Sequence, residues 1–189
     1  METYDLILKR RTIRKYQQKP IDKAILLDCI NAARLAPSAM NLQPLDYVLV
    51  TKPDSLKKIF TCTNWAGYNR DAGPKPGEEP VAYIVIISDK NVNSEPGRDV
   101  GLASENIVLT ALEHGVASCM LGAINRDAIA GILKIPGNYK VEIVVSMGYP
   151  AQESIEDELK NEKHYWLDDD GKLHVPKRKM EDVMHDEVF

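Results

Sequence analysis

The stretch Val81-Ala82-Tyr83-Ile84-Val85-Ile86-Ile87 decides the fold class of this chain of 189 residues. Successive side chains of a strand point to opposite faces of its sheet, and here both sets are apolar. A continuous run of this kind is typical of a strand that is buried on both faces. It is the strongest strand in the sequence, so we expect a layered protein built on one main sheet.

Helical and extended patterns alternate around this strand. Residues 22–35 carry apolar side chains at helical spacing, with Asp22 as a suitable N-cap. Residues 99–114 predict a second helix, capped by Asp99 and ended by Gly115, which is apolar on most of its surface and is therefore expected to be central and buried. Further helices are expected over 53–60 and 126–133, and strands over 47–50, 116–121 and 141–147.

This order of elements predicts a single α/β or α+β domain over residues 1–189. Residues 61–80 are rich in proline and glycine and are expected to form a loop, while 151–189 are acidic and polar and are interpreted as an extended C-terminal arm. Neither G-x-G-x-x-G nor G-x-x-x-x-G-K-[ST] follows any expected strand. If a phosphate is bound, side-chain arginines must hold it.

The composition excludes several classes of protein. Apolar residues make up 44% and charged residues 28%, with a net charge of −4, so neither a nucleic-acid-binding surface nor a membrane span is expected. Three widely spaced cysteines argue against disulfides and favour the cytoplasm. The spacing of His164, His174 and His185 matches no common metal site, and Cys119 is interpreted as a core thiol because no partner base is identifiable. We therefore expect no metal site, and no nucleophile elbow or catalytic triad can be read from the sequence.

The segment Arg10-Arg11-Thr12-Ile13-Arg14 is the first candidate binding motif. Three guanidinium groups this close together repel one another unless an anion lies between them, and phosphate matches their planar geometry. The alternative is a solvated cationic cluster at the end of an N-terminal helix, where the helix dipole also favours positive charge.

Three further segments could carry chemistry, and each also has an ordinary structural interpretation. Residues 37–44 place Ser38, Asn41 and Gln43 between two prolines, which suits the polar edge of a heteroaromatic ring or a simple helix-to-strand connection. Residues 120–125 end a strand at Gly122, where a planar ligand could approach the backbone or the chain could merely turn. Residues 174–179 are a basic cluster that could complete a phosphate site or be a solvated run of charge.

Together, in this order, these segments resemble the FMN-dependent nitroreductase family. The family pattern Arg-Arg-Ser-x-Arg-x-(Phe/Tyr) corresponds to residues 10–16, and Ala-Pro-Ser-x-x-Asn-x-Gln-Pro corresponds to residues 36–44. A glycine-containing strand end follows at 121–123, then Met147-Gly148-Tyr149-Pro150 in place of Leu-Gly-Tyr-Pro, and finally the basic segment 176–183. Thr12 replaces the usual serine, and Met40 is larger than the residue often found there.

The resemblance implies an α+β fold, with a central mostly antiparallel mixed sheet flanked by helices, in an interlocked homodimer that holds FMN at its interface. The implied FMN-binding residues come from both subunits. One subunit contacts the phosphate, the ribityl chain, the ring edge and flavin N5, and the other contributes the loop with Ser38. These residues are Arg10, Arg11, Thr12, Arg14, Gly122, Ala123, Lys177, Arg178 and possibly adjacent Lys179 from the first, and Ser38, Met40, Asn41 and Gln43 from the second. Residues 61–80 would form a lid, with dimer packing as the other role for Trp65, Tyr68 and Arg70.

The implied activity is ping-pong transfer of a hydride from NADH or NADPH, through FMN, to a nitroaromatic, a quinone or a related small electron acceptor. Two alternatives stay open at this point: a flavin-binding protein without enzymatic activity, and other flavin chemistry such as reductive dehalogenation. A third alternative, an acidic structural or interaction domain, would leave Arg14 without a functional role.

Overall fold

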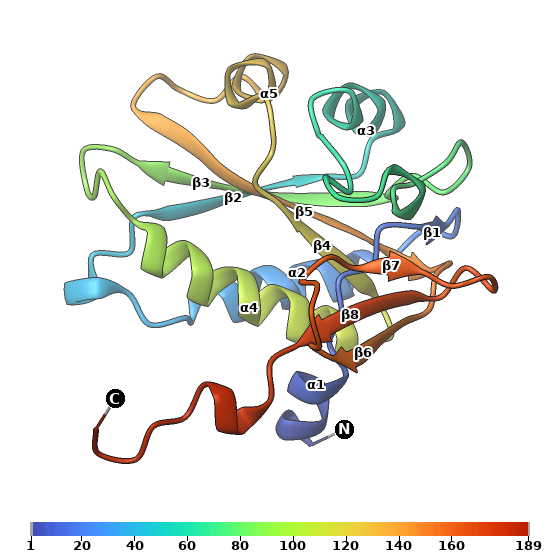
Figure 1. Ribbon diagram of the computed structural model, residues 1–189. Coiled ribbons are helices and arrows are strands. Elements are labelled where there is room, and N and C mark those ends of the chain that lie inside the picture. The colour runs from blue at the N-terminus through green and yellow to red at the C-terminus, as the bar shows by residue number, and fades with distance from the viewer. Residues whose placement is uncertain (1, 189) are drawn as a thin grey trace.

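The computed structural model describes residues 2–188 and contains two groups of strands together with five α-helices (Figure 1). The helices are α1 (Thr3–Lys9), α2 (Lys23–Arg34), α3 (Pro53–Phe60), α4 (Gly97–Glu113) and α5 (Arg126–Leu133), with short 3-10 turns η1 (Ala39–Asn41), η2 (Arg70–Ala72) and η3 (Met180–Asp182). The strands are β1 (Tyr16–Gln17), β2 (Leu45–Val50), β3 (Ala82–Asp89), β4 (Ala117–Leu121), β5 (Tyr139–Pro150), β6 (Ser154–Glu158), β7 (Trp166–Leu167) and β8 (Leu173–Lys177).

The main sheet is organised around β5, the longest strand. Its order is β1-β5-β3-β2, and β4 pairs with β5 beside β1; every pairing between these five strands is antiparallel. Ile84 lies opposite Val145, so the middle of β3 faces the middle of β5. The α+β class with a mostly antiparallel sheet flanked by helices, implied by the resemblance, is confirmed.

Burial of β3 on both faces is confirmed as well. The side chains of Ala82, Ile84 and Ile86 pack with α2 and α4, whereas Tyr83, Val85 and Ile87 pack with α3 and α5 on the other face. Figure 1 shows these two helical layers above and below the sheet. The period-two alternation of one apolar strand therefore fills both halves of the core.

The predicted helices form, with two corrections concerning α4. The side chain of Asp22 accepts a hydrogen bond from the Ala24 N–H as an N-cap, and Gly115 follows α4 with φ +70°, as expected. Asp99, however, is not the cap of α4: the helix begins at Gly97 after Pro96, and Asp99 lies inside the first turn. The helix is also buried on one side only in the single chain, because it lies flat on the sheet and leaves Leu102 46% exposed.

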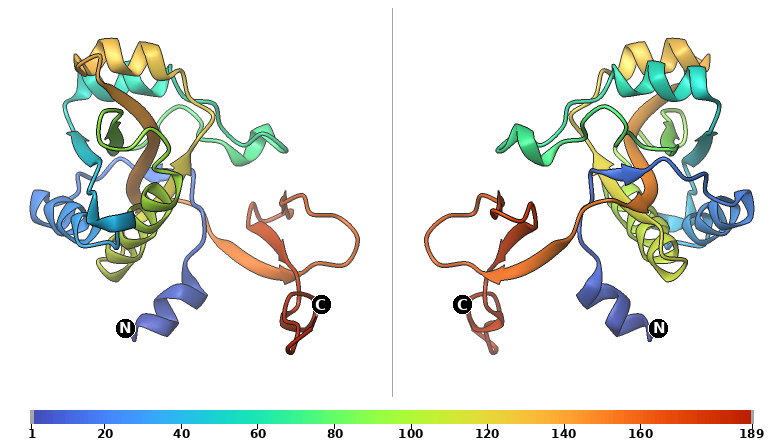
Figure 2. Two further views of the ribbon diagram at one scale, coloured as in Figure 1. Left: turned by 90° about the vertical axis from the view of Figure 1, so that its left-hand side faces the viewer. Right: turned by 90° about the vertical axis from the view of Figure 1, so that its right-hand side faces the viewer.

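The C-terminal segment is more regular than an extended arm. β6 pairs with β8 in parallel, and β7 pairs with β8 antiparallel. Figure 2 shows this small sheet and α1 projecting from the main body. Leu173 of β8 is fully buried against Ala66 and Ala72, so residues of the 61–80 loop share a small core with the C-terminal sheet. No helix within residues 2–188 is both long enough and apolar enough to cross a membrane.

Candidate functional site

The arginine segment leaves α1 and runs beside the first residues of β4. Arg10 caps the C-terminus of α1, with its N–H bonded to the Leu6 carbonyl. Thr12 forms a bridge with Ser118, and the Ile13 N–H donates to the Ser118 carbonyl over 3.1 Å. These backbone contacts fix the three guanidinium groups at one edge of the main sheet.

The three guanidinium groups have different partners. Arg10 lies 3.5 Å from the Glu105 carboxylate of α4, and Arg11 lies 2.5 Å from the Glu156 carboxylate of β6. The Arg14 guanidinium instead lies over the Tyr165 ring, 4.7 Å from its centroid. Among residues 2–188, no carboxylate oxygen is within 4.0 Å of this group. Arg14 is thus the guanidinium of the segment that has no carboxylate partner among residues 2–188.

A cavity of about 210 Å³ adjoins this segment and carries unused hydrogen-bonding capacity. Arg10 and Arg11 line it together with Gln152 and Ser154. The Gln152 side-chain amide nitrogen and the Ser154 hydroxyl are buried, and neither has a hydrogen-bond partner in the described chain. Because an amide nitrogen and a guanidinium can only donate, and a hydroxyl can donate, an acceptor-rich ligand satisfies this set. The donor set therefore fits a phosphorylated cofactor.

Tyr16 and Gly148 hold the arginine segment against β5. Tyr16 is fully buried, and its hydroxyl donates to the Ile13 carbonyl at 2.6 Å and shares a hydrogen bond with the Ser146 hydroxyl at 2.9 Å. A Cβ built on Gly148 would lie 2.7 Å from the Tyr16 side chain. The glycine of Met-Gly-Tyr-Pro thus makes room for the aromatic ring that ends the arginine motif.

The predicted backbone site at Gly122 and Ala123 follows the far end of β4. Both residues are exposed, and nothing lies within 4 Å of a Cβ built on Gly122. The Asn64 N–H donates to the Ala123 carbonyl at 2.9 Å, which brings the 61–80 loop to this strand end. Since Gly122 lies four residues beyond Ser118, it is roughly 13 Å along the strand from Thr12. One strand thus carries the arginine segment at one end and an open backbone at the other.

The basic C-terminal residues lie in the small sheet. Lys177 ends β8 and lies opposite Glu158 of β6. Two residues earlier, Val175 lies opposite Glu156, whose carboxylate Arg11 binds. Lys177 is therefore roughly 7 Å further along the strands. The Arg178 guanidinium donates to the backbone carbonyl of Asp182, and Lys179 is paired with Glu158 and Glu181. Of these three cations, Lys179 is already compensated by carboxylates.

Residues 38–43 are not brought to the arginines within one chain. Ser38 contacts Asp99 of α4, whereas Arg10 contacts Glu105. These two α4 residues are about 9 Å apart along the helix axis and about 120° apart around it. Met40, Asn41 and Gln43 are exposed, and Figure 1 shows the η1 turn at one end of α4 with α1 beneath the other.

The buried thiol of Cys119 has the properties of a core residue. Burial raises its pKa to about 11, although the nearby Arg14 guanidinium opposes the shift. A thiol with this pKa is protonated at neutral pH and is a poor nucleophile. The interpretation of Cys119 as a core thiol agrees with its environment.

Several contributors were missed from the sequence. Glu105, Glu156 and Gln152 carry no local motif, and their roles come from contacts with residues far away in the chain. Tyr165 gave a weak signal as one of two aromatic residues in the polar C-terminal segment His164-Tyr165-Trp166-Leu167. It is joined to the 61–80 loop by a ring contact with Tyr68, whose centroid lies 5.5 Å away.

The fold defines the class of the protein: an α+β protein whose antiparallel sheet is covered by helices on both faces, with an arginine-rich segment at one strand edge. The chain belongs to the nitroreductase family, whose model matches residues 7–149. It is 33% identical, over 160 residues, to the Archaeoglobus fulgidus protein named "Putative NADH dehydrogenase/NAD(P)H nitroreductase", covering 80% of this chain and 87% of that protein.

Solved structures agree with this assignment. The chain is 27% identical to an FMN-dependent nitroreductase from Clostridium difficile R20291, with a TM-score of 0.73 and coverage of 97% of this chain and 98% of the other. A structure from Parabacteroides distasonis shares the fold, with a TM-score of 0.76 at 22% identity and coverage of 100% and 99%.

Proposed function

We propose that the protein is an FMN-dependent oxidoreductase that uses NADH or NADPH to reduce nitroaromatics, quinones or related small electron acceptors. The observation that carries the proposal is the arginine segment. The Arg14 guanidinium has no carboxylate partner in the described chain, and Arg10 and Arg11 line a cavity together with Gln152 and Ser154, whose buried side-chain donors are unsatisfied. The descriptions of its relatives as NAD(P)H and FMN-dependent nitroreductases support the same conclusion.

The roles of the binding residues follow from their partners. Arg14, Lys177 and Arg178 lack carboxylate partners among residues 2–188 and are assigned to the phosphate. Arg10 and Arg11 are already paired, so they orient the segment and offer their remaining N–H groups, as Thr12 offers its hydroxyl. Gly122 and Ala123 supply exposed backbone against which a planar ring can lie.

The opposite side of the site would come from a second copy of the chain. The exposed loop with Ser38, Met40, Asn41 and Gln43 would face the arginine segment of its partner in a homodimer. Exposed apolar side chains support this association, since such patches mark interaction surfaces. They include Tyr4, Ile7, Leu8, Leu102, Met180, Val183 and Met184.

Bound FMN would supply the redox chemistry, which is hydride transfer from the nicotinamide to the acceptor with ping-pong kinetics. No side chain of this protein is assigned as an acid or base. Loop 61–80 would act as a lid together with the C-terminal segment: Tyr68 contacts Tyr165, which in turn lies against Arg14. This lid would exclude water and shape the space for the acceptor.

The first test is the visible absorption spectrum of the purified protein, which should show flavin bands. FMN-loaded protein should be reduced by NADH or NADPH and reoxidised by a nitroaromatic or quinone. Protein that cannot be reconstituted with FMN would contradict the cofactor assignment. FMN-loaded protein that neither nicotinamide reduces would instead support the alternative of a flavin-binding protein without this activity.

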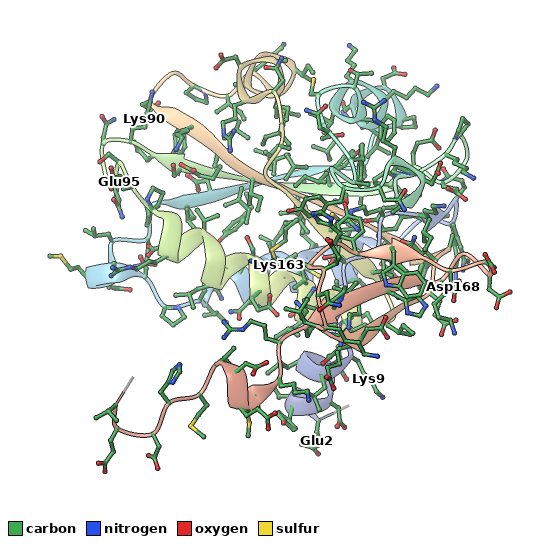
Figure 3. The ribbon with its side chains drawn as sticks, viewed as in Figure 1. Glu2, Lys9, Lys90, Glu95, Lys163 and Asp168 are labelled. Carbon is green, nitrogen blue, oxygen red and sulfur yellow. The ribbon has the colours of Figure 1, made fainter. Side chains whose placement is uncertain are left out.

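Arg14→Ala tests the phosphate site directly. Loss of charged hydrogen bonds should weaken FMN binding about 10- to 100-fold, measured by titrating apoprotein with FMN and following flavin fluorescence. Lys90→Ala is the control, because Lys90 is exposed and lies far from Lys9 and the C-terminal sheet (Figure 3). Equal FMN affinity of the two variants would refute the role of Arg14.

A further inference from the structure

The loop from Ser38 to Gln43 has an unusual backbone. Met40, Asn41 and Gln43 have φ values of 51°, 54° and 50°, in the left-handed region that favours glycine. Their side chains are exposed, and Met40 is 91% exposed, so packing of these side chains does not hold the conformation. Such strain persists only where surrounding contacts determine the backbone.

The contacts that hold this loop converge on Asp99. The Ser38 hydroxyl donates to one carboxylate oxygen at 2.6 Å, and the Ala39 N–H donates to the other at 3.3 Å. The Ser38 oxygen also accepts a hydrogen bond from the Gln43 N–H at 2.9 Å. Asp99 thus fixes both ends of the strained segment, directly at Ala39 and through Ser38 at Gln43.

Asp99 is buried and occupies a place where a negative charge is stabilised. It is 4% exposed and lies in the first turn of the 17-residue helix α4, near the positive end of the helix dipole. The Asp99 charge also contributes to the raised pKa of Tyr47. Burial is the largest cause, followed by the charges of Asp46 and Asp99, and together they raise this pKa to about 12. The buried carboxylate thus accepts two hydrogen bonds from the loop, one from the Ser38 hydroxyl and one from the Ala39 N–H.

We propose that Asp99 is a positioning residue for the cofactor: it sets the geometry in which residues 38–43 meet the flavin ring edge, without touching the flavin itself. The inference rests on the proposed function, because it assumes that this loop binds FMN. Its content is separate, since it assigns the shape of the loop to Asp99 of α4, acting through Ser38, in addition to the backbone hydrogen bonds within the loop.

Two variants probe this connection. Asp99→Asn keeps the size of the side chain but replaces one acceptor oxygen with an NH₂ group, so either the Ser38 hydroxyl or the Ala39 N–H loses its acceptor. Ser38→Ala removes the link to Gln43 and leaves the rest of the loop intact. Each should weaken FMN binding about 10-fold or more, because a hydrogen bond to a charged group is lost. The double variant should bind FMN only slightly less tightly than the single variant with the lower affinity, because both substitutions break the same connection.

The experiment titrates FMN into apoprotein of the wild type and each variant, with flavin fluorescence as the readout. The visible spectrum of the bound flavin and the apoprotein melting temperature are recorded alongside. Asp54→Asn is the matched control, since Asp54 is an exposed first-turn aspartate of α3. We expect weaker binding and a shifted flavin spectrum for the Asp99 and Ser38 variants, and no change for the control.

A lower melting temperature of Asp99→Asn with unchanged FMN affinity and spectrum would show a merely structural role and overturn the inference. Independent, additive losses in the double variant would overturn it as well. If the wild type itself binds no FMN, the proposed function fails and takes the inference with it. If the wild type binds FMN and the Asp99 and Ser38 variants bind it equally well, only the inference fails and the proposed function stands.

Discussion

Gly148→Ala should destabilise the protein because the added methyl group has no space. The new Cβ would lie 2.7 Å from Tyr16 atoms, whereas ordinary contact begins at 3.4 Å, so the ring or the strand must move by about 0.7 Å. Overpacking of this kind costs about 1–3 kcal/mol. A displaced ring would also weaken the Tyr16 hydroxyl's hydrogen bonds to Ile13 and Ser146, at about 1 kcal/mol each.

We therefore expect Gly148→Ala to lower the free energy of unfolding by about 2–4 kcal/mol, which for a chain of this size is a loss of roughly 5–15 °C in melting temperature. Urea and thermal denaturation of the apoprotein measure both quantities. Gly131→Ala is the control, since Gly131 lies inside α5 with nothing within 4 Å of a built Cβ, and it should stabilise the protein by about 0.5–1 kcal/mol. If Gly148→Ala remains within about 0.5 kcal/mol of the wild type, the tight Tyr16 contact is not what requires glycine here.

In the native protein at neutral pH, iodoacetamide should modify the partly exposed Cys62 before Cys119, because burial raises the pKa of the Cys119 thiol to about 11. Peptide mass spectrometry measures the order of modification, and the reverse order would contradict the burial argument. His174 lies between the carboxylates of Asp157, at 2.6 Å, and Asp168, at 3.1 Å, and hydrogen bonding to Asp168 first and Asp157 second raises its pKa above the ordinary 6.5. The stabilisation is therefore complete below pH 6.5 and is lost as the pH rises through the folded-state pKa. The protection factors of β7 and β8, which correct for the intrinsic pH dependence of amide exchange, should fall over that range, and His174→Gln should abolish this fall. An unchanged protection profile in the variant would contradict this role.

The parts of the fold that depend on local sequence were predictable. The helices over 53–60 and 126–133 form over the same residues that the pattern predicted, because their starts carry local signals: Pro53 in the first turn of one and Asn125 as the cap of the other. The two-sided burial of β3 likewise follows from its own side chains.

The errors arose where distant residues decide the outcome. Asp99 has the chemistry of an N-cap, but Ser38, 61 positions earlier, uses its carboxylate instead. The C-terminal sheet has few apolar residues, and its core is completed by Ala66 and Ala72, which no pattern after residue 150 could indicate. The partner of Arg11 is 145 residues away. For the candidate site, the residues expected to face the ligand stay a prediction from the sequence. The carboxylates that decide which arginine has no acidic partner could not be predicted from it.

The connection between Arg11 and Glu156 has a consequence for the order of events during synthesis. The arginine segment is made before the core strands, yet its contacts with Gln152 and Glu156 require chain that is made about 140 residues later. Closing contacts over such long separations is slow compared with forming local helices. On the ribosome, the main sheet can assemble through β5 before residues 151–177 emerge. The contacts around the arginine segment are thus completed only after the core, so if this segment binds FMN as proposed, the nascent chain would take up the cofactor only after the core has formed.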